Sequence, residues 1–156
     1  MHPGVERVAA ALRERGATGE VVELADSART ATEAAAALRV DVGAIVNSLV
    51  FADGDGDARL ILTSGAHRVD TAHVGAVLGT TLKRADPDLV RTATGQAIGG
   101  VAPVGHPAPV RTYVDTALSV YDIVWAAAGH PHAVFPTTFD ELVRITGGAP
   151  IAVEPA

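Results

Sequence analysis

The sequence lacks cysteine altogether and has only one lysine and few aromatic side chains. The absence of cysteine excludes disulfides, cysteine nucleophiles and thiolate metal sites. Aromatic residues make up only 4% of the chain, so the core must be built from Ala, Val, Leu and Ile. No stretch approaches the length of a membrane span, and residues 1–16 lack a signal-peptide core. We therefore expect a cytoplasmic protein without a membrane partner.

The charge balance of the chain is acidic. It has 12 Lys and Arg residues against 18 Asp and Glu residues, a net charge of −6 and a pI of about 5.4. Domains that hold a long nucleic acid carry a basic footprint instead. The composition therefore argues against DNA binding.

The length and composition predict one globular domain over residues 1–156, because 48% of the residues are hydrophobic and 19% are charged. Apolar periodicity and capping motifs predict helices over 5–15, 30–38, 70–79, 87–93 and 139–145. Short helical turns are expected at 42–45 and 116–120. Predicted strands cover 20–24, 48–51, 59–62, 81–83, 110–114, 123–127, 133–135 and 151–153. Strands and helices that do not alternate strictly indicate the α+β class.

The stretch 94–107, TGQAIGGVAPVGHP, is predicted to be a loop. Four glycines and two prolines in fourteen residues leave no room for a long helix or strand. Gly99 and Gly100 allow the backbone to approach a ligand closely, and Pro103 stiffens the exit. Such a loop can direct its own amide N–H groups at a substrate oxygen. On composition alone, a plain surface turn explains the same residues.

The sequence offers no conventional nucleophile or metal site. Ser64 and Ser119 lack the Gly-x-Ser-x-Gly context that exposes a serine nucleophile. His130 and His132 could share a strand face as zinc ligands, but the proline between them favours a turn and no acidic residue lies near. The alternating Asp residues of 53–57 are typical of a hairpin tip and lack the rest of a calcium loop. We therefore expect neither a metal nor a cofactor.

Four stretches of the chain together resemble a known family. One is TGQAIGGVAPVG, which contains a GxxxP motif from Gly99 to Pro103. The others are AAAALRVDVGAIVNSLVF (34–51), GAHRVD (65–70), and YVD (113–115) with AAGHPHAVFPTTFDELVRITG (127–147). In this order, and over nearly the whole chain, they resemble the YbaK family of bacterial aminoacyl-tRNA deacylases, which is related to the editing domain of prolyl-tRNA synthetases.

The resemblance implies a mixed, strongly curved sheet, partly closed like a barrel, with helices packed outside it. It also implies a trans-editing hydrolase that deacylates tRNA mischarged with a small amino acid such as Cys, Ala or Ser. In this family the glycine loop and the substrate itself carry the hydrolysis, without a metal or cofactor. The partner would be the aminoacyl end of a tRNA, with an aminoacyl-tRNA synthetase as a second partner. The oligomeric state stays open.

Carried over position by position, the resemblance also assigns site residues. The backbone wall that positions the ester is assigned to Gly99, Gly100 and Val101. The substrate-binding residues, which come from the same loop and three other stretches, are Asn47, Ser48, Arg68, Ala102, Pro103, Ala128, Gly129 and His130. Arg68 is included as a source of positive charge, and a solvated surface arginine is the alternative interpretation.

The chain departs from the family pattern at Asn47. Family members carry a lysine in the motif I-x-K-[ST]-L-[VL], whereas this chain reads IVNSLV over 45–50. Asparagine can hydrogen-bond a phosphate or carbonyl but brings no charge. Gln96 and Ala127 are smaller departures, from a tyrosine and a small hydroxyl residue. A binding module that recognises a nucleotide, an amino-acid analogue or a protein partner is therefore an alternative to the enzyme, and hydrolysis of another small activated ester is a third.

Overall fold

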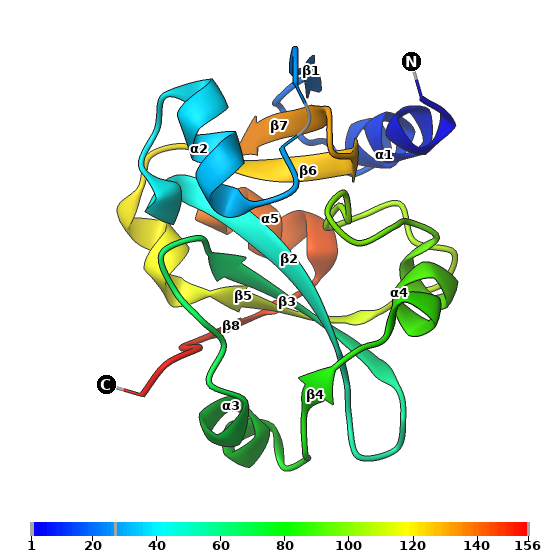
Figure 1. Cartoon of the computed structure of the whole chain (residues 1–156), viewed down its shortest axis with the longest axis vertical. Helices are drawn as coiled ribbons and strands as arrows, with labels where there is room; N and C mark the ends of the chain where they lie inside the picture. The colour runs from blue at the N-terminus through cyan, green and yellow to red at the C-terminus, as the bar shows by residue number, and fades with distance from the viewer. Residues whose placement is uncertain (1, 27, 156) are drawn as a thin grey trace.

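The computed structural model describes residues 2–26 and 28–155 (Figure 1). All five predicted helices and both helical turns are present within these ranges. The helices are α1 (Pro3–Glu14), α2 (Ala31–Leu38), α3 (Thr71–Leu78), α4 (Pro87–Thr94) and α5 (Phe139–Thr146), and the 3-10 turns are η1 (Val42–Ala44) and η2 (Thr116–Val120). The sequence therefore located every helix to within a few residues.

Side-chain caps define where the helices begin. Thr30 and Glu33 form the predicted reciprocal capping box at the start of α2. The second predicted box is only half formed, because Thr138 accepts from the backbone N–H of Glu141 but the Glu141 carboxylate turns elsewhere. That carboxylate accepts from the backbone N–H of Thr18 at 3.1 Å. It thereby ties the segment after α1 to α5.

The strands form one mixed sheet. They are β1 (Val22–Glu23), β2 (Ile45–Ala52), β3 (Ala58–Ser64), β4 (Lys83–Arg84), β5 (Arg111–Asp115), β6 (Val124–His130), β7 (Ala133–Thr137) and β8 (Ala149–Ile151). The order is β1-β7-β6-β2-β3-β5-β8, with β4 added to β2. The β2–β6, β3–β5 and β5–β8 pairs are parallel and the others are antiparallel. The result is an α+β fold whose sheet is mixed and unclosed, with β1 and β8 as its ends.

Among the strand boundaries that differ from the predictions, two are set by pairing with distant segments. β2 begins at Ile45, three residues before the predicted start, because its first residues pair in parallel with Trp125 and Ala126 of β6. β8 covers Ala149–Ile151 and not 151–153, since its pairing follows β5. Both pairings join segments far apart in the sequence, so the local pattern could not reveal them.

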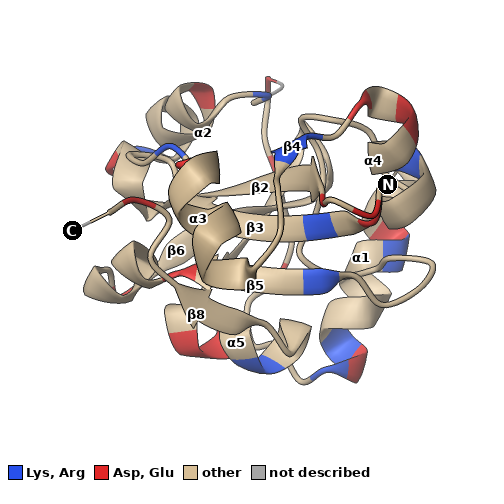
Figure 2. Cartoon of the chain, turned by 90° about the horizontal axis from the view of Figure 1, so that it is seen from below, with Lys and Arg blue, Asp and Glu red and all other residues tan. Residues whose placement is uncertain are grey.

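Helices cover both faces of the sheet. Val46 and Val50 of β2 face the main core, to which α1 contributes Val8 and α5 contributes Leu142. Leu49 and Phe51 face the other way and pack in a cluster with Val74 of α3. The alternation of β2 side chains therefore joins two apolar layers. β2 and β6 carry no charged residue, whereas charges gather on the helices and loops around them (Figure 2).

The two edges of β2 are paired differently. One edge pairs with β3 continuously from Val46 to Ala52. The other edge pairs with β6 only at Ile45 and Val46 and with β4 only at Phe51 and Ala52. Between these short pairings, residues 47–50 have no strand beside them. The Val50 carbonyl accepts from the N–H of Ala85 there, so Ser48, two residues earlier, also directs its backbone N–H and C=O into the gap.

Asp115 is a buried carboxylate that joins three elements. It is 1% exposed and ends β5. One carboxylate oxygen accepts from the hydroxyl of Thr63 and from the backbone N–H of Ser64, at 3.1 and 3.0 Å, and the other from the N–H of Ala117 at 3.0 Å. The Nδ1 atom of His67 lies 3.1 Å from the first oxygen. The carboxylate thus fixes the end of β3 against η2.

We expect Asp115→Ala to lower the free energy of unfolding by about 3 kcal/mol or more, because it leaves several buried donors without an acceptor. Urea unfolding followed by circular dichroism measures this loss. Asp122→Ala removes an exposed carboxylate nearby and should change stability by less than about 0.5 kcal/mol. Equal unfolding midpoints for the two variants would contradict the role given to Asp115.

Candidate functional site

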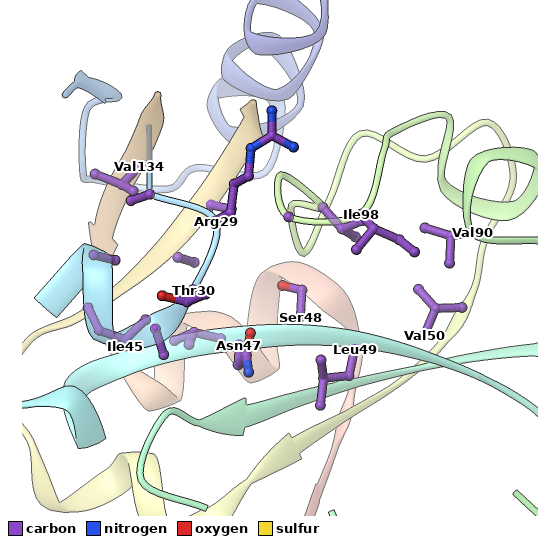
Figure 3. A pocket seen from close by; sticks show the side chains of 18 of the residues that line it. Arg29, Thr30, Ile45, Asn47, Ser48, Leu49, Val50, Val90, Ile98 and Val134 are labelled. Atoms are coloured by element: carbon purple, nitrogen blue, oxygen red, sulfur yellow. The ribbon is translucent and has the colours of Figure 1, made fainter. Parts of the chain in front are cut away.

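A cavity of about 280 Å³ lies over the unpaired edge of β2 (Figure 3). Its floor is the β2 segment 45–50, and its other walls are β6, the start of α2, β4 and the glycine loop. The lining residues are Ala28, Arg29, Thr30, Ala31, Ala34, Ile45, Val46, Asn47, Ser48, Leu49, Val50, Arg84, Ala85, Val90, Ile98, Gly99, Val101, Trp125, Ala126, Ala127 and Val134. The gap in strand pairing therefore creates the cavity.

The cavity walls are mostly small and aliphatic. Ala31 and Ala34 of α2 lie on one side, and Ala126 and Ala127 of β6 close the cavity at the β6 end of the gap. Ile98 at the tip of the glycine loop also lines the cavity and is 49% exposed. The walls are therefore mainly apolar.

Ser48 is the polar residue at the centre of the floor. Its side chain projects from β2 toward the side on which Thr30 and Ile98 lie (Figure 3). Its hydroxyl oxygen is buried, and within 2–26 and 28–155 no hydrogen-bond partner approaches it. Buried polar atoms are rarely left unpaired, because each costs roughly 1–3 kcal/mol. The floor thus combines this hydroxyl with the backbone groups of the unpaired edge.

The glycine loop is held from its inner side by Gln96. This side chain is 4% exposed; its oxygen accepts from the N–H of Ala102 at 2.6 Å and its amide donates to the carbonyl of Val104 at 3.3 Å. Thr94 at the end of α4 donates to the Gln96 carbonyl and accepts from its N–H. One carboxamide therefore fixes both limbs of the loop. In the sequence Gln96 stood out only as a departure from the family pattern.

His106 adds a second support behind the loop. Its Nε2 atom lies 2.8 Å from the carbonyl oxygen of Ala102. Burial lowers the pKa of the His106 ring, although the bond to that carbonyl acts in the opposite direction. A neutral ring that keeps this bond must carry its proton on Nε2, so His106 donates to Ala102.

Gly100 and β6 approach each other more closely than side chains would allow. A Cβ atom on Gly100 would lie 2.9 Å from the Cα atom of His130, which is backbone and cannot swing aside. Behind it, Gly129 has a φ of +97° and a Cβ there would lie 2.6 Å from the carbonyl oxygen of Gly4 in α1. Residues 128–130, which the resemblance assigns to substrate binding, thus form the irregular end of β6, with a register shift between Ala127 and His130. Its glycine lets α1, β6 and the glycine loop stack.

The structure brings only some of the predicted site residues to the cavity. Asn47, Ser48, Gly99 and Val101 line it. The predicted residues outside the lining are Gly100, Ala102, Pro103, Ala128, Gly129, His130 and Arg68. Most of these support the loop or β6 from behind. Pro103 lines a separate hollow on the far side of the loop.

Arg68 lies away from the cavity, in the segment after β3, where its backbone N–H is 3.4 Å from a carboxylate oxygen of Glu154. The positive charge at the cavity comes instead from Arg29, just before α2, and Arg84 in β4. No local pattern in the sequence indicates that these two arginines lie at the cavity. The two arginines are 55 residues apart and meet the same cavity only because β4 and α2 both flank the gap in β2.

Two other clusters of titratable groups lie outside the cavity lining. Asp53, Asp55 and Asp57 form the predicted hairpin tip, and their ligand atoms lie within 4.8 Å of one another. The Asp53 carboxylate already accepts hydrogen bonds from the N–H of Asp55 and from Arg59. Burial alone would raise the pKa of Asp53, but these bonds outweigh burial and lower the pKa. The cluster therefore serves the turn.

The other cluster consists of the stacked rings of His2, His130 and His132, with centroids 4.7 and 5.3 Å apart along the series. Burial lowers the pKa of His130, and the nearby His2, His132 and Arg29 add to this effect. In the part of the chain that the structure describes, the only group that could hold a metal by ligand spacing is the Asp cluster.

Comparison with known proteins assigns the chain to a family. The model of the aminoacyl-tRNA editing domain matches residues 25–145. The chain belongs to the aminoacyl-tRNA editing domain family. The YbaK-like resemblance seen in the sequence is thereby confirmed. The matched segment contains every residue of the cavity lining.

Three known proteins are similar to this editing domain over most of its length. A crystal structure of a protein proposed to be a trans-editing enzyme for prolyl tRNA synthetase superimposes with a TM-score of 0.93 at 44% identity, covering 100% of this chain and 99% of that one. The crystal structure of hypothetical protein APE2540 has a TM-score of 0.88 at 28% identity, covering 94% and 98%. The uncharacterized protein YwhH of Bacillus subtilis (strain 168) is 31% identical over 79% of this chain and 78% of its own. The fold thus extends over nearly the full length of the two solved structures.

Among the residues that the structure describes, no helix has both the length and the apolarity needed to cross a bilayer.

We expect Gln96→Ala to destabilise the editing domain by about 2–4 kcal/mol, because the buried N–H of Ala102 and C=O of Val104 lose their partner. The glycine loop should open first, so hydrogen exchange of the Ala102 amide should accelerate more than that of Leu62 in β3. Differential scanning calorimetry and amide exchange by NMR measure the two effects. Unchanged exchange at Ala102 would show that Gln96 does not hold the loop.

Proposed function

We propose that this protein is a trans-editing hydrolase that deacylates tRNA mischarged with a small amino acid such as Cys, Ala or Ser. The observation that carries the proposal is the cavity over the unpaired edge of β2, closed by Gly99 and Val101 of the glycine loop. The family assignment supports hydrolysis of aminoacyl-tRNA in general. The choice of a small amino acid follows from the family resemblance seen in the sequence. The aminoacyl end of a tRNA, a synthetase that recruits the protein and a cytoplasmic location belong to the same proposal.

The chemistry fits a site made mainly of backbone. Among the residues that line the cavity there is no His, Asp, Glu or Lys, so a side-chain general base is not at hand. An aminoacyl ester is already activated, and positioning together with oxyanion-type N–H donors supplies much of the rate enhancement. The loop amides at Gly99 and Val101 and the N–H of Ser48 are the donors that this geometry offers, because the N–H of Gly100 already donates to the carbonyl of Ala97. The substrate would supply any further proton transfer.

The amino acid that is removed depends on the cavity volume. One methylene in an apolar pocket discriminates by only about 1–3 kcal/mol, so an apolar cavity separates small amino acids by modest factors. Ala31, Ala34, Ala126 and Ala127 hold the walls apart, and a larger residue at any of them would narrow the space. The protein should therefore accept several small aminoacyl groups at different rates.

We expect wild-type protein to deacylate at least one of Ala-, Cys- and Ser-charged tRNA above the uncatalysed rate, and Gly100→Ala to lose at least about tenfold. The added methyl group meets the backbone of His130 and pushes the loop away from β6. Single-turnover deacylation measures the rates. Gly54→Ala, in the exposed hairpin, is the matched control and should retain the wild-type rate. A folded wild-type protein without turnover on any of the three would contradict the proposal.

A second candidate function, a binding module without hydrolysis, is favoured by Asn47. This residue lines the cavity where family members have a lysine, and asparagine brings no charge. If this candidate holds, Asn47→Lys should create or raise deacylase activity while the wild type only binds. Measuring binding and single-turnover rates for both proteins separates the two functions. A wild type that hydrolyses as fast as Asn47→Lys would rule out the binding module.

A further inference from the structure

We infer that Arg29 and Arg84 form a phosphate clamp at the mouth of the cavity that holds the single-stranded 3′ end of an aminoacylated RNA. The inference rests on the proposed function and names the contact through which the substrate is positioned. It assigns to two arginines of this chain the charge that Asn47 does not supply. Neither arginine belongs to the segments in which the family resemblance was recognised.

The two arginines lie at opposite ends of the gap in β2. Arg84 pairs with Phe51 in the short β2–β4 ladder. Arg29 lies at the other end, where the residues before α2 face the glycine loop, and its side chain extends outward from the cavity, away from β2 (Figure 3). Strand β4 and the segment before α2 lie on the same side of β2 (Figure 2). Val46 and Phe51, the paired residues on either side of the gap, lie roughly 17 Å apart along β2. A strand that crosses the mouth therefore meets a cation at each end.

Both guanidinium groups are free to bind an anion. Arg29 and Arg84 are exposed, and neither takes part in an ion pair with another residue of 2–26 or 28–155. Exposed arginines without a carboxylate partner are available for bidentate contacts to phosphate. The chain as a whole is acidic, with a net charge of −6. A phosphate contact on this molecule must therefore be local.

Each arginine is also held in place by packing. The guanidinium carbon of Arg84 lies 5.8 Å from the ring centroid of Phe51, which is buried. Stacking on an aromatic ring leaves the edges of the guanidinium free for hydrogen bonds. The stem of Arg29 packs on the loop, since a Cβ atom on Gly99 would lie 3.5 Å from its Cγ atom. Arg29 is thus coupled to the loop that closes the cavity.

The chemistry of the substrate points to phosphate. An aminoacyl ester has no carboxylate, so the anionic groups of an aminoacylated RNA are its phosphodiesters. The 3′ end of a tRNA is single-stranded, and its last phosphodiester lies one nucleoside away from the ester. When the ester occupies the cavity, that phosphate must lie near the mouth. The clamp therefore acts on binding, and Arg29 and Arg84 are positioning residues.

The test compares Arg84→Gln and Arg29→Gln with Lys83→Gln, on two substrates. Lys83 is the neighbour of Arg84 in β4, is exposed and does not line the cavity. The Lys83→Gln substitution therefore removes one positive charge beside the clamp without changing the clamp itself. The substrates are an aminoacylated tRNA and the same aminoacyl ester of adenosine, which has no phosphate. The values of kcat and KM are measured for each at increasing salt concentration.

We expect each arginine variant to raise KM for the charged tRNA about tenfold with little change in kcat. The slope of log(kcat/KM) against log salt should fall by roughly 0.7 for each lost phosphate contact. On aminoacyl-adenosine the variants should match the wild type, and Lys83→Gln should match it on both substrates. Equal losses on the two substrates would overturn the clamp, because they would mean a structural role. An equal loss in Lys83→Gln would overturn it in favour of diffuse charge.

A binding experiment separates failure of the clamp from failure of the proposed function. Fluorescence anisotropy of an uncharged RNA hairpin with a single-stranded 3′ end, titrated with wild type and with Arg84→Gln, needs no hydrolysis. Weaker binding by the variant supports the clamp even if no deacylation occurs. Unchanged binding overturns it, and so does displacement of the RNA by free adenosine monophosphate at equal concentration, since the site would then read a lone phosphate and not a strand.

Discussion

The structure depends on how β2 shares its two edges. One edge is satisfied along its length by β3, whereas the other is divided between two short partners, β6 and β4, that diverge from each other. A strand edge without a neighbour exposes backbone donors and acceptors, and proteins normally cover such an edge. Here α2, β6, β4 and the glycine loop surround it without pairing to it. The result is a cavity whose floor can form hydrogen bonds while its walls are aliphatic.

The glycine loop is held by hydrogen bonds on the side that faces away from the cavity. Its hydrogen bonds come from behind, through the buried carboxamide of Gln96 and the ring of His106, so its front is left to face the cavity. Gly100 serves the close contact with β6, while Gly99, with a φ of +93°, allows the turn that faces Arg29. A site that works through backbone donors needs this arrangement, because donors stabilise a developing charge only if they are already in place.

The sequence predicted the elements better than the site. Helix starts carry local signals such as Thr30 with Glu33, so they could be located from a few residues. The glycine loop and its resemblance to a family also pointed to the right part of the chain. The cavity itself depends on long-range pairing, such as Ile45 with Trp125, which leaves no trace in the local pattern. For that reason the sequence points to Arg68, which lies in a stretch that matches the family, as the source of positive charge. It does not single out Arg84, which lies in a two-residue strand.

The proposed clamp accounts for how an acidic chain could hold a polyanion. At physiological ionic strength exposed charges interact over about 8 Å, so the net charge of the whole molecule matters less at a bound phosphate than the groups beside it. Two unpaired arginines at the mouth of a cavity then outweigh distant carboxylates. A lysine on the floor would place its charge among aliphatic walls, where desolvation weakens it. In the proposed clamp the charge lies at the mouth and stays hydrated until a phosphate arrives, and Asn47 on the floor would be left as a neutral hydrogen-bonding group.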